Sequence, residues 1–212
     1  LELPEERRKE FAKHLGEGMR LFQQERIFEC IDALDKAEKV FPKSAELLNL
    51  RGSCYMEIRA FDKAGTALDK AILISPKNII IRFNIAEIQF VTKQWKKADD
   101  LFQEILKDIP EGNMSIGRLV EFKILLCKKK LGQDEDVLAL TAKYDFKDDS
   151  PYYYYVKAAQ AYDAEKLIEA EEWTARALRV FRDPKLIAPW QDTMAEYGYI
   201  KSFPVEDDPA EK

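Results

Sequence analysis

Three prolines of this sequence are spaced 34 residues apart: Pro42, Pro76 and Pro110. Small residues recur in step with them, namely Gly18, Gly52 and Ala86, then Cys30, Ala64 and Ala98. A fixed period of this length is typical of one supersecondary unit copied along the chain, in which each copy buries its apolar face against the next. The period therefore predicts a repeat protein, and it favours a binding scaffold over an enzyme.

Each copy has the pattern of two helices. Glu46–Ile58 carries apolar or small residues at helical spacing, and Asp62–Ile74 does the same after a short turn. Ser75–Pro76 ends the second helix, because proline lacks an amide donor and restricts the residue before it. Gly52 and Ala64 are expected where the paired helices cross, since a larger side chain there would force the axes apart.

These repeated residues resemble the tetratricopeptide repeat family. The matches in the second copy are Leu48, Gly52, Tyr55, Phe61, Ala64, Leu68, Ala71 and Pro76. The copies on either side follow the same pattern, and two degenerate copies come after a slip in the period beyond Pro110. The resemblance covers Phe11 to Pro184. It implies an all-α, right-handed superhelical solenoid of antiparallel helix pairs whose function is protein binding.

We expect a single solenoid over residues 1–200, followed by an acidic, disordered tail at 201–212. The repeats are expected at about 11–44, 45–78, 79–112, 118–150 and 152–184, with a C-terminal capping helix at about 185–200. One face of that last helix is apolar: Leu186, Ile187, Trp190, Met194 and Tyr197. A terminal helix of this kind covers the exposed end of a stack. The alternative is a helix that docks in the groove or on another subunit.

The first helices of the pairs are expected to line a concave groove. The face of these helices opposite the helix–helix contact is rich in Met and Phe, which indicates an interaction site. The candidate peptide-binding residues are Leu15, Met19, Phe22, Asn49, Met56, Phe83, Glu87, Phe90, Phe122 and Leu126. The amide of Asn49 can both donate to and accept from a peptide backbone. The alternative is that this stripe is partly core, or is filled by the protein's own terminal helix.

The resemblance does not extend to the family members that grip an acidic chaperone C-terminus. Those proteins use lysine, asparagine and arginine at concave positions, where this chain has mostly apolar residues such as Leu15, Ile80 and Phe83. The groove is more similar to members that hold an extended or helical hydrophobic segment, such as the translocator chaperones of bacterial secretion systems.

Composition argues against most other functions. His14 is the only histidine, and the sequence has no glycine-rich phosphate loop and no cysteine pair with metal-ligand spacing. We therefore expect no catalytic residue, cofactor or metal. Cys30, Cys54 and Cys127 fall at small inward positions and are expected in the core. The net charge of −5 disfavours nucleic acid, and no apolar run reaches the roughly 18 residues of a membrane span.

The sequence thus predicts a non-enzymatic protein–protein interaction module, an adaptor, scaffold or chaperone-like protein that binds a hydrophobic peptide or helix in its groove. The alternative is a structural subunit whose apolar surface drives homo-oligomeric assembly, with a homodimer as a possible form. A cytoplasmic location is favoured. Export stays open, because Leu1 is not an initiator methionine and a signal peptide could have been removed.

Overall fold

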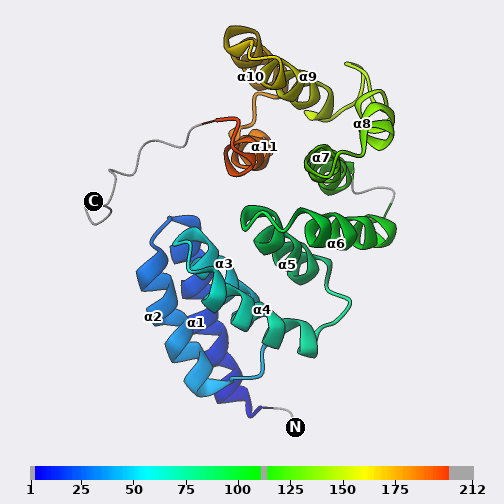
Figure 1. Cartoon of the computed structure of the whole chain (residues 1–212). Coiled ribbons are helices and arrows are strands. Elements are labelled where there is room, and N and C mark those ends of the chain that lie inside the picture. The colour runs from blue at the N-terminus through cyan, green and yellow to red at the C-terminus, as the bar shows by residue number, and fades with distance from the viewer. Residues whose placement is uncertain (1–2, 111–113, 201–212) are drawn as a thin grey trace, which may run out of the picture. The chain divides into compact units, whose positions relative to one another are not determined.

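The computed structural model describes residues 3–110 and 114–200 of the chain. Within these ranges the chain forms eleven helices and no strand (Figure 1). In chain order they are α1 (Glu5–Gln23), α2 (Ile27–Val40), α3 (Ala45–Glu57), α4 (Phe61–Ile74), α5 (Ile79–Val91), α6 (Trp95–Asp108), α7 (Met114–Lys130), α8 (Asp134–Thr141), α9 (Tyr152–Asp163), α10 (Leu167–Phe181) and α11 (Pro184–Tyr197). The expected all-α class is confirmed.

These helices belong to two compact units, Leu1–Ile88 and Gln89–Lys212. The boundary falls within α5, so most of this helix belongs to the first unit and its end to the second. The expectation of one continuous solenoid over residues 1–200 stays a prediction. The acidic tail expected at 201–212 lies outside the described residues.

The first unit is built from helix pairs. α1 packs along α2, α3 packs along α4, and α2 joins the two pairs by packing on α3. The predicted crossing residues lie in the core between α3 and α4: Ala64 is fully buried, and a Cβ on Gly52 would come within 2.7 Å of the Cγ of Leu68. Only glycine therefore fits at position 52 without a shift of Leu68, as the sequence predicts.

Gly52→Ala is expected to destabilise the protein by about 1–3 kcal/mol, because the new methyl overlaps Leu68, whose side chain is fully buried. Gly65→Ala is the matched control on α4. A Cβ on Gly65 meets nothing within 4 Å, so alanine there should stabilise by up to about 1 kcal/mol through its helix propensity. Urea unfolding measures both changes. Equal stabilities of the two variants would show that α3 and α4 do not touch at Gly52.

The second unit contains the end of α5 and helices α6 to α11. α6 packs on α7, α7 on α8, and α9 along α10, while α11 contacts both α10 and α7. α8 is only eight residues long and has no buried residue, as expected for a degenerate copy. α7 begins at Met114, four residues before the start expected for this copy at about residue 118, and Gly117 is buried within the helix.

The three cysteines are free and buried, as the sequence predicts. The Sγ atoms of Cys30 and Cys54 lie 3.2 Å apart in the core of the first unit. Burial raises the pKa of both thiols, and the contact with Cys30 raises that of Cys54 further. Both thiols therefore stay protonated in the folded protein at pH values where an exposed cysteine ionises.

These raised pKa values predict a loss of stability at alkaline pH. Unfolded thiols ionise near pH 8.5, so the stabilisation is fully present below that pH and is lost as the pH rises toward the folded pKa values. Urea midpoints in reducing buffer should fall between neutral pH and about pH 9.5, below the range of free tyrosine. The fall should be smaller in a Cys30→Ala, Cys54→Ala variant. If the urea midpoints of the two proteins fell equally with pH, the raised pKa values of Cys30 and Cys54 would not be the cause of the loss.

Candidate protein-binding site

Amide and hydroxyl side chains of α3 and α5 meet on one face of the first unit. Nδ2 of Asn84 donates to Oδ1 of Asn49 at 2.9 Å and to Oγ of Ser53 at 3.3 Å. The Ser53 hydroxyl donates in turn to the Asn49 backbone carbonyl, one helical turn earlier. The Nδ2 group of Asn49 has no hydrogen-bond partner among the described residues, so this network orients a half-buried amide whose donor is available to a ligand.

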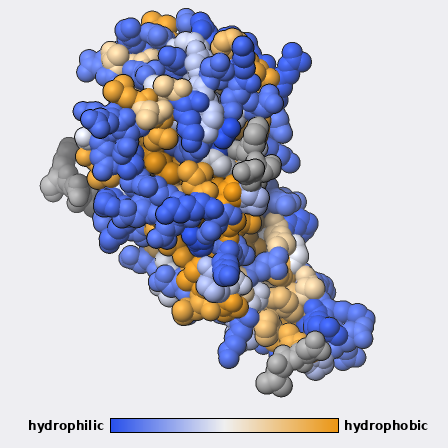
Figure 2. Space-filling view, turned by 90° about the vertical axis from the view of Figure 1, so that its right-hand side faces the viewer, coloured by the Kyte–Doolittle hydropathy of each residue, from blue (hydrophilic) through white to orange (hydrophobic). Residues whose placement is uncertain are grey.

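Partly exposed apolar side chains occur on the same helix as this amide and at equivalent repeat positions of the first unit. Met19 lies one 34-residue period before Ser53, so it occupies the equivalent position on α1, and it is 36% exposed. Phe22 and Met56 are half-buried and pack against the core of the first unit. Phe83 precedes Asn84 on α5 and is also half-buried. The space-filling view shows patches of apolar residues on a surface that is otherwise mostly hydrophilic (Figure 2).

Two predicted site residues of the first unit are not on an open surface. Leu15 is 5% exposed and belongs to the core, and Glu87 is 9% exposed. The prediction that Leu15 and Glu87 line an open groove wall is therefore wrong. The first unit retains Met19, Phe22, Asn49, Met56 and Phe83 as candidates, and peptide contact by these five stays a prediction.

The three predicted site residues of the second unit are fully buried. Phe90, Phe122 and Leu126 have no exposed surface. The ring of Phe122 lies 5.4 Å from that of Trp190 on α11, and the ring of Phe90 lies 6.4 Å from that of Tyr197 at the end of the same helix. The prediction that these three residues line an open groove is therefore wrong, because all three are buried and side chains of α11 lie against Phe90 and Phe122. Figure 1 shows α11 beside α7.

Charged and aromatic contacts also hold α11 in this position. Nζ of Lys123, on α7, lies 3.6 Å from a carboxylate oxygen of Glu196 and 4.6 Å from the centre of the Phe90 ring. Beyond α11, the Tyr199 hydroxyl donates to Asp163 at 2.6 Å. Burial raises the pKa of the Tyr197 hydroxyl to about 12, so this hydroxyl stays protonated at neutral pH. In the second unit, α11 therefore covers the surface around Phe90 and Phe122 that the sequence predicts as a binding site.

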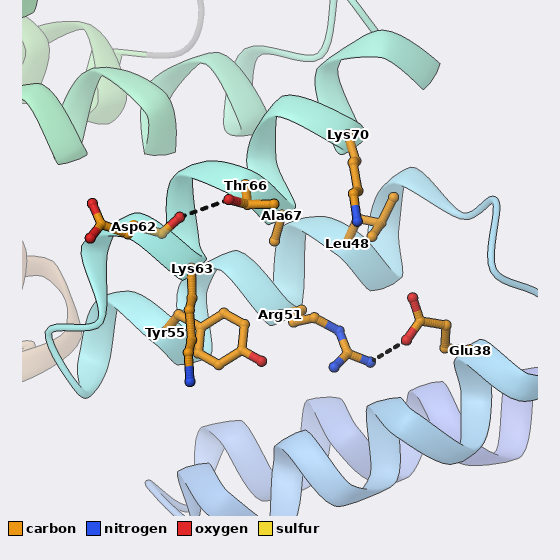
Figure 3. Close-up of a pocket in the computed structure, with 9 residues that line it drawn as sticks. All are labelled: Glu38, Leu48, Arg51, Tyr55, Asp62, Lys63, Thr66, Ala67 and Lys70. Carbon is orange, nitrogen blue, oxygen red and sulfur yellow. Dashed lines mark hydrogen bonds and ion pairs between the residues drawn. The ribbon is translucent and has the colours of Figure 1, made fainter.

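A pocket of about 370 Å³ opens between α2, α3 and α4 (Figure 3). The lining residues are Glu38, Leu48, Arg51, Tyr55, Asp62, Lys63, Thr66, Ala67 and Lys70. Arg51 donates to Asp35 at 2.6 Å and to Glu38 at 3.1 Å, and the Thr66 hydroxyl donates to the backbone carbonyl of Asp62. None of the ten predicted site residues lines this pocket. Because several of its polar groups already bind one another, it is a weaker candidate than the face around Asn49.

No family model and no curated protein matches the sequence. Solved structures do match. A structure from a study of pilF of Pseudomonas aeruginosa has a TM-score of 0.62 and 14% identity, with 91% of this chain and 97% of that chain covered. TTC0263, a TPR protein of Thermus thermophilus, has a TM-score of 0.62 and 15% identity over 87% and 98% of the two chains.

YrrB, a TPR protein with an unusual peptide-binding site, has a TM-score of 0.58 and 16% identity over 89% of this chain and 95% of its own. The chain has the tetratricopeptide repeat fold. This agrees with the resemblance carried by residues such as Gly52, Ala64 and Pro76, and it confirms the expected architecture of helix pairs in a TPR solenoid. None of the described helices is long and apolar enough to cross a membrane. The same residues contain no group of three or more His, Cys, Asp or Glu side chains that could hold a metal ion.

Proposed function

We propose that this TPR chain is a non-enzymatic protein–protein interaction module that binds a hydrophobic peptide on the first unit. The binding surface is formed by Met19, Asn49, Met56, Phe83 and Asn84, and is called the Asn49 face. The observation that carries the proposal is the pair of asparagines, in which Asn84 holds the Asn49 side chain while leaving its Nδ2 donor to a ligand. A peptide-binding site in YrrB, which shares the fold, supports the same class of function.

The asparagine pair would recognise the peptide backbone. A peptide carbonyl laid across α3 would accept from Nδ2 of Asn49, and the Asn84 contact fixes that donor before the ligand arrives. A pre-oriented side chain loses less conformational entropy on binding, so more of the hydrogen-bond free energy appears as affinity. A net gain of about 0.5–1.5 kcal/mol is typical of one such bond.

The neighbouring apolar side chains would set the sequence preference. Met19 is flexible and polarizable, and such side chains adapt to varied apolar ligands. Met56 and Phe83 are half-buried, so each keeps part of its surface for a ligand. We therefore expect the Asn49 face to prefer peptides that carry apolar side chains and have an accessible backbone. It should accept different apolar residues at these positions.

The test begins with selection of peptides from a phage-displayed library of random peptides on the immobilised full chain. We expect enrichment of hydrophobic sequences. The selected peptide is then titrated against wild type and Asn49→Asp, which keeps the oxygen that accepts from Asn84 but removes the Nδ2 donor. This variant should bind about tenfold more weakly, since 1.4 kcal/mol corresponds to a factor of ten.

Gln191→Glu is the control, because it makes the same change of charge at an exposed residue of the second unit. Its affinity should equal that of wild type. The proposal fails if no peptide is enriched, or if Asn49→Asp binds the selected peptide as tightly as wild type does.

A further inference from the structure

Two cysteine thiols meet where the helix pairs of the first unit join. Cys30 lies on α2 and Cys54 lies on α3, the helices through which the two pairs pack together. Their Sγ atoms are 3.2 Å apart, and both side chains are fully buried in the core. A disulfide has an S–S separation of about 2.0 Å, so the two sulfurs need to approach by only about 1.2 Å to bond.

The repeat pattern shows that the fold does not require cysteine at these positions. One 34-residue period after Cys30 the chain has Ala64, and one period after Cys54 it has Ile88. Both of these residues are buried. Apolar side chains therefore fill the same two repeat positions farther along the first unit. The contact of two thiols is a feature of the junction between α2 and α3, and not of the repeat.

We propose that Cys30 and Cys54 form a disulfide that links α2 to α3 when the chain folds in the presence of a small-molecule disulfide such as oxidised glutathione. Fully buried thiols do not meet an oxidant, so the reaction takes place while α2 and α3 are apart, during folding or local opening. Exposed thiols ionise near pH 8.5, so the open chain has a fraction of reactive thiolate at neutral pH.

The bond forms by two thiol–disulfide exchanges. The thiolate of one cysteine attacks a sulfur of the small disulfide, which gives a mixed disulfide and releases one small thiolate. The thiolate of the second cysteine then attacks the protein sulfur of the mixed disulfide, which forms the bond between Cys30 and Cys54 and releases the second small thiolate. The two protein thiols lose two protons and two electrons in total, and the small disulfide takes up both and becomes two thiols.

The bond would join cysteines that are 24 positions apart in the chain. A cross-link restricts the unfolded chain, so one that fits the native core stabilises the fold. Asn49 and Ser53 precede Cys54 on α3, so the bond would also tie the helix that carries the Asn49 face to the first helix pair. Bond formation is independent of peptide binding, so it can be tested whether or not a peptide binds the Asn49 face.

Mass spectrometry of the full chain tests whether the bond forms. The protein is unfolded in urea, refolded with reduced and oxidised glutathione, and alkylated in acid-quenched, denatured samples. We expect wild type to lose about 2 Da and to keep one alkylated cysteine, Cys127. Cys127→Ala should lose the same mass, and Cys30→Ala should not. Three alkylated cysteines in the refolded wild type, or a bond that involves Cys127, overturns the proposal.

Urea unfolding tests whether the bond fits the native core. The midpoint of oxidised wild type should lie about 1 M above that of the reduced protein, and reduction with dithiothreitol should remove the difference. The Cys30→Ala, Cys54→Ala variant is the control, and its midpoint should be the same after either treatment. An oxidised wild type that unfolds at the same or a lower urea concentration than the reduced protein overturns the proposal.

Discussion

Trp190→Ala is expected to lower the free energy of unfolding of the second unit by about 3–5 kcal/mol. Trp190 is 2% exposed, and its ring lies 5.4 Å from that of Phe122 and 5.5 Å from that of Tyr155. Alanine at this position removes the aromatic contacts between α11 and both α7 and α9, and leaves a cavity that the surrounding rings cannot fill. Urea unfolding followed by circular dichroism measures the loss.

Gln191→Ala is the control on the same helix. Gln191 is exposed, so its truncation should change stability by no more than about 0.5 kcal/mol. If Trp190→Ala had an equally small effect, α11 would not fill the inner face of the second unit. Phe122 and Leu126 would then again be candidates for an open binding surface.

Leu68→Ala is expected to cost about 2–5 kcal/mol in the first unit, because Leu68 is fully buried and its truncation leaves a cavity between α3 and α4. The cost should be smaller when Gly52 is already alanine. The methyl group at position 52 then occupies part of the vacated space, and the overlap with Leu68 disappears.

Urea unfolding of the two single variants and of Gly52→Ala, Leu68→Ala together gives the coupling between these positions. A favourable coupling of about 0.5–3 kcal/mol is expected for residues in direct contact. Costs that simply add would contradict the close approach of α3 and α4 at Gly52.

The local parts of the fold could be predicted from the sequence, because they depend on residues that are close along the chain or repeated at a fixed period. Gly52 and Ala64 recur in phase with the prolines, and both lie at the helix crossing where the period places them. Pro151 is the N-cap of α9, and the hydroxyl of the preceding Ser150 accepts from the Tyr152 amide at 3.3 Å.

The predicted site was less accurate, because helical periodicity shows which residues share a face but not what covers that face. Phe122 and Leu126 share a face of α7, but the side chains of α11 lie against Phe122. Lys123 would be taken as a surface charge from its sequence, yet its side chain is 2% exposed and lies against Glu196. These contacts join segments more than sixty residues apart, and no repeat period connects them.

Binding of a peptide at the Asn49 face should change the side-chain amide signal of Asn49 in nitrogen-edited NMR spectra. This signal is identified by its loss in Asn49→Asp. On saturation with the selected peptide, we expect a clear shift of the Asn49 and Asn84 side-chain amides, while that of Gln191 in the second unit stays in place. Saturated binding that leaves the Asn49 amide unshifted would show that the peptide does not bind this face.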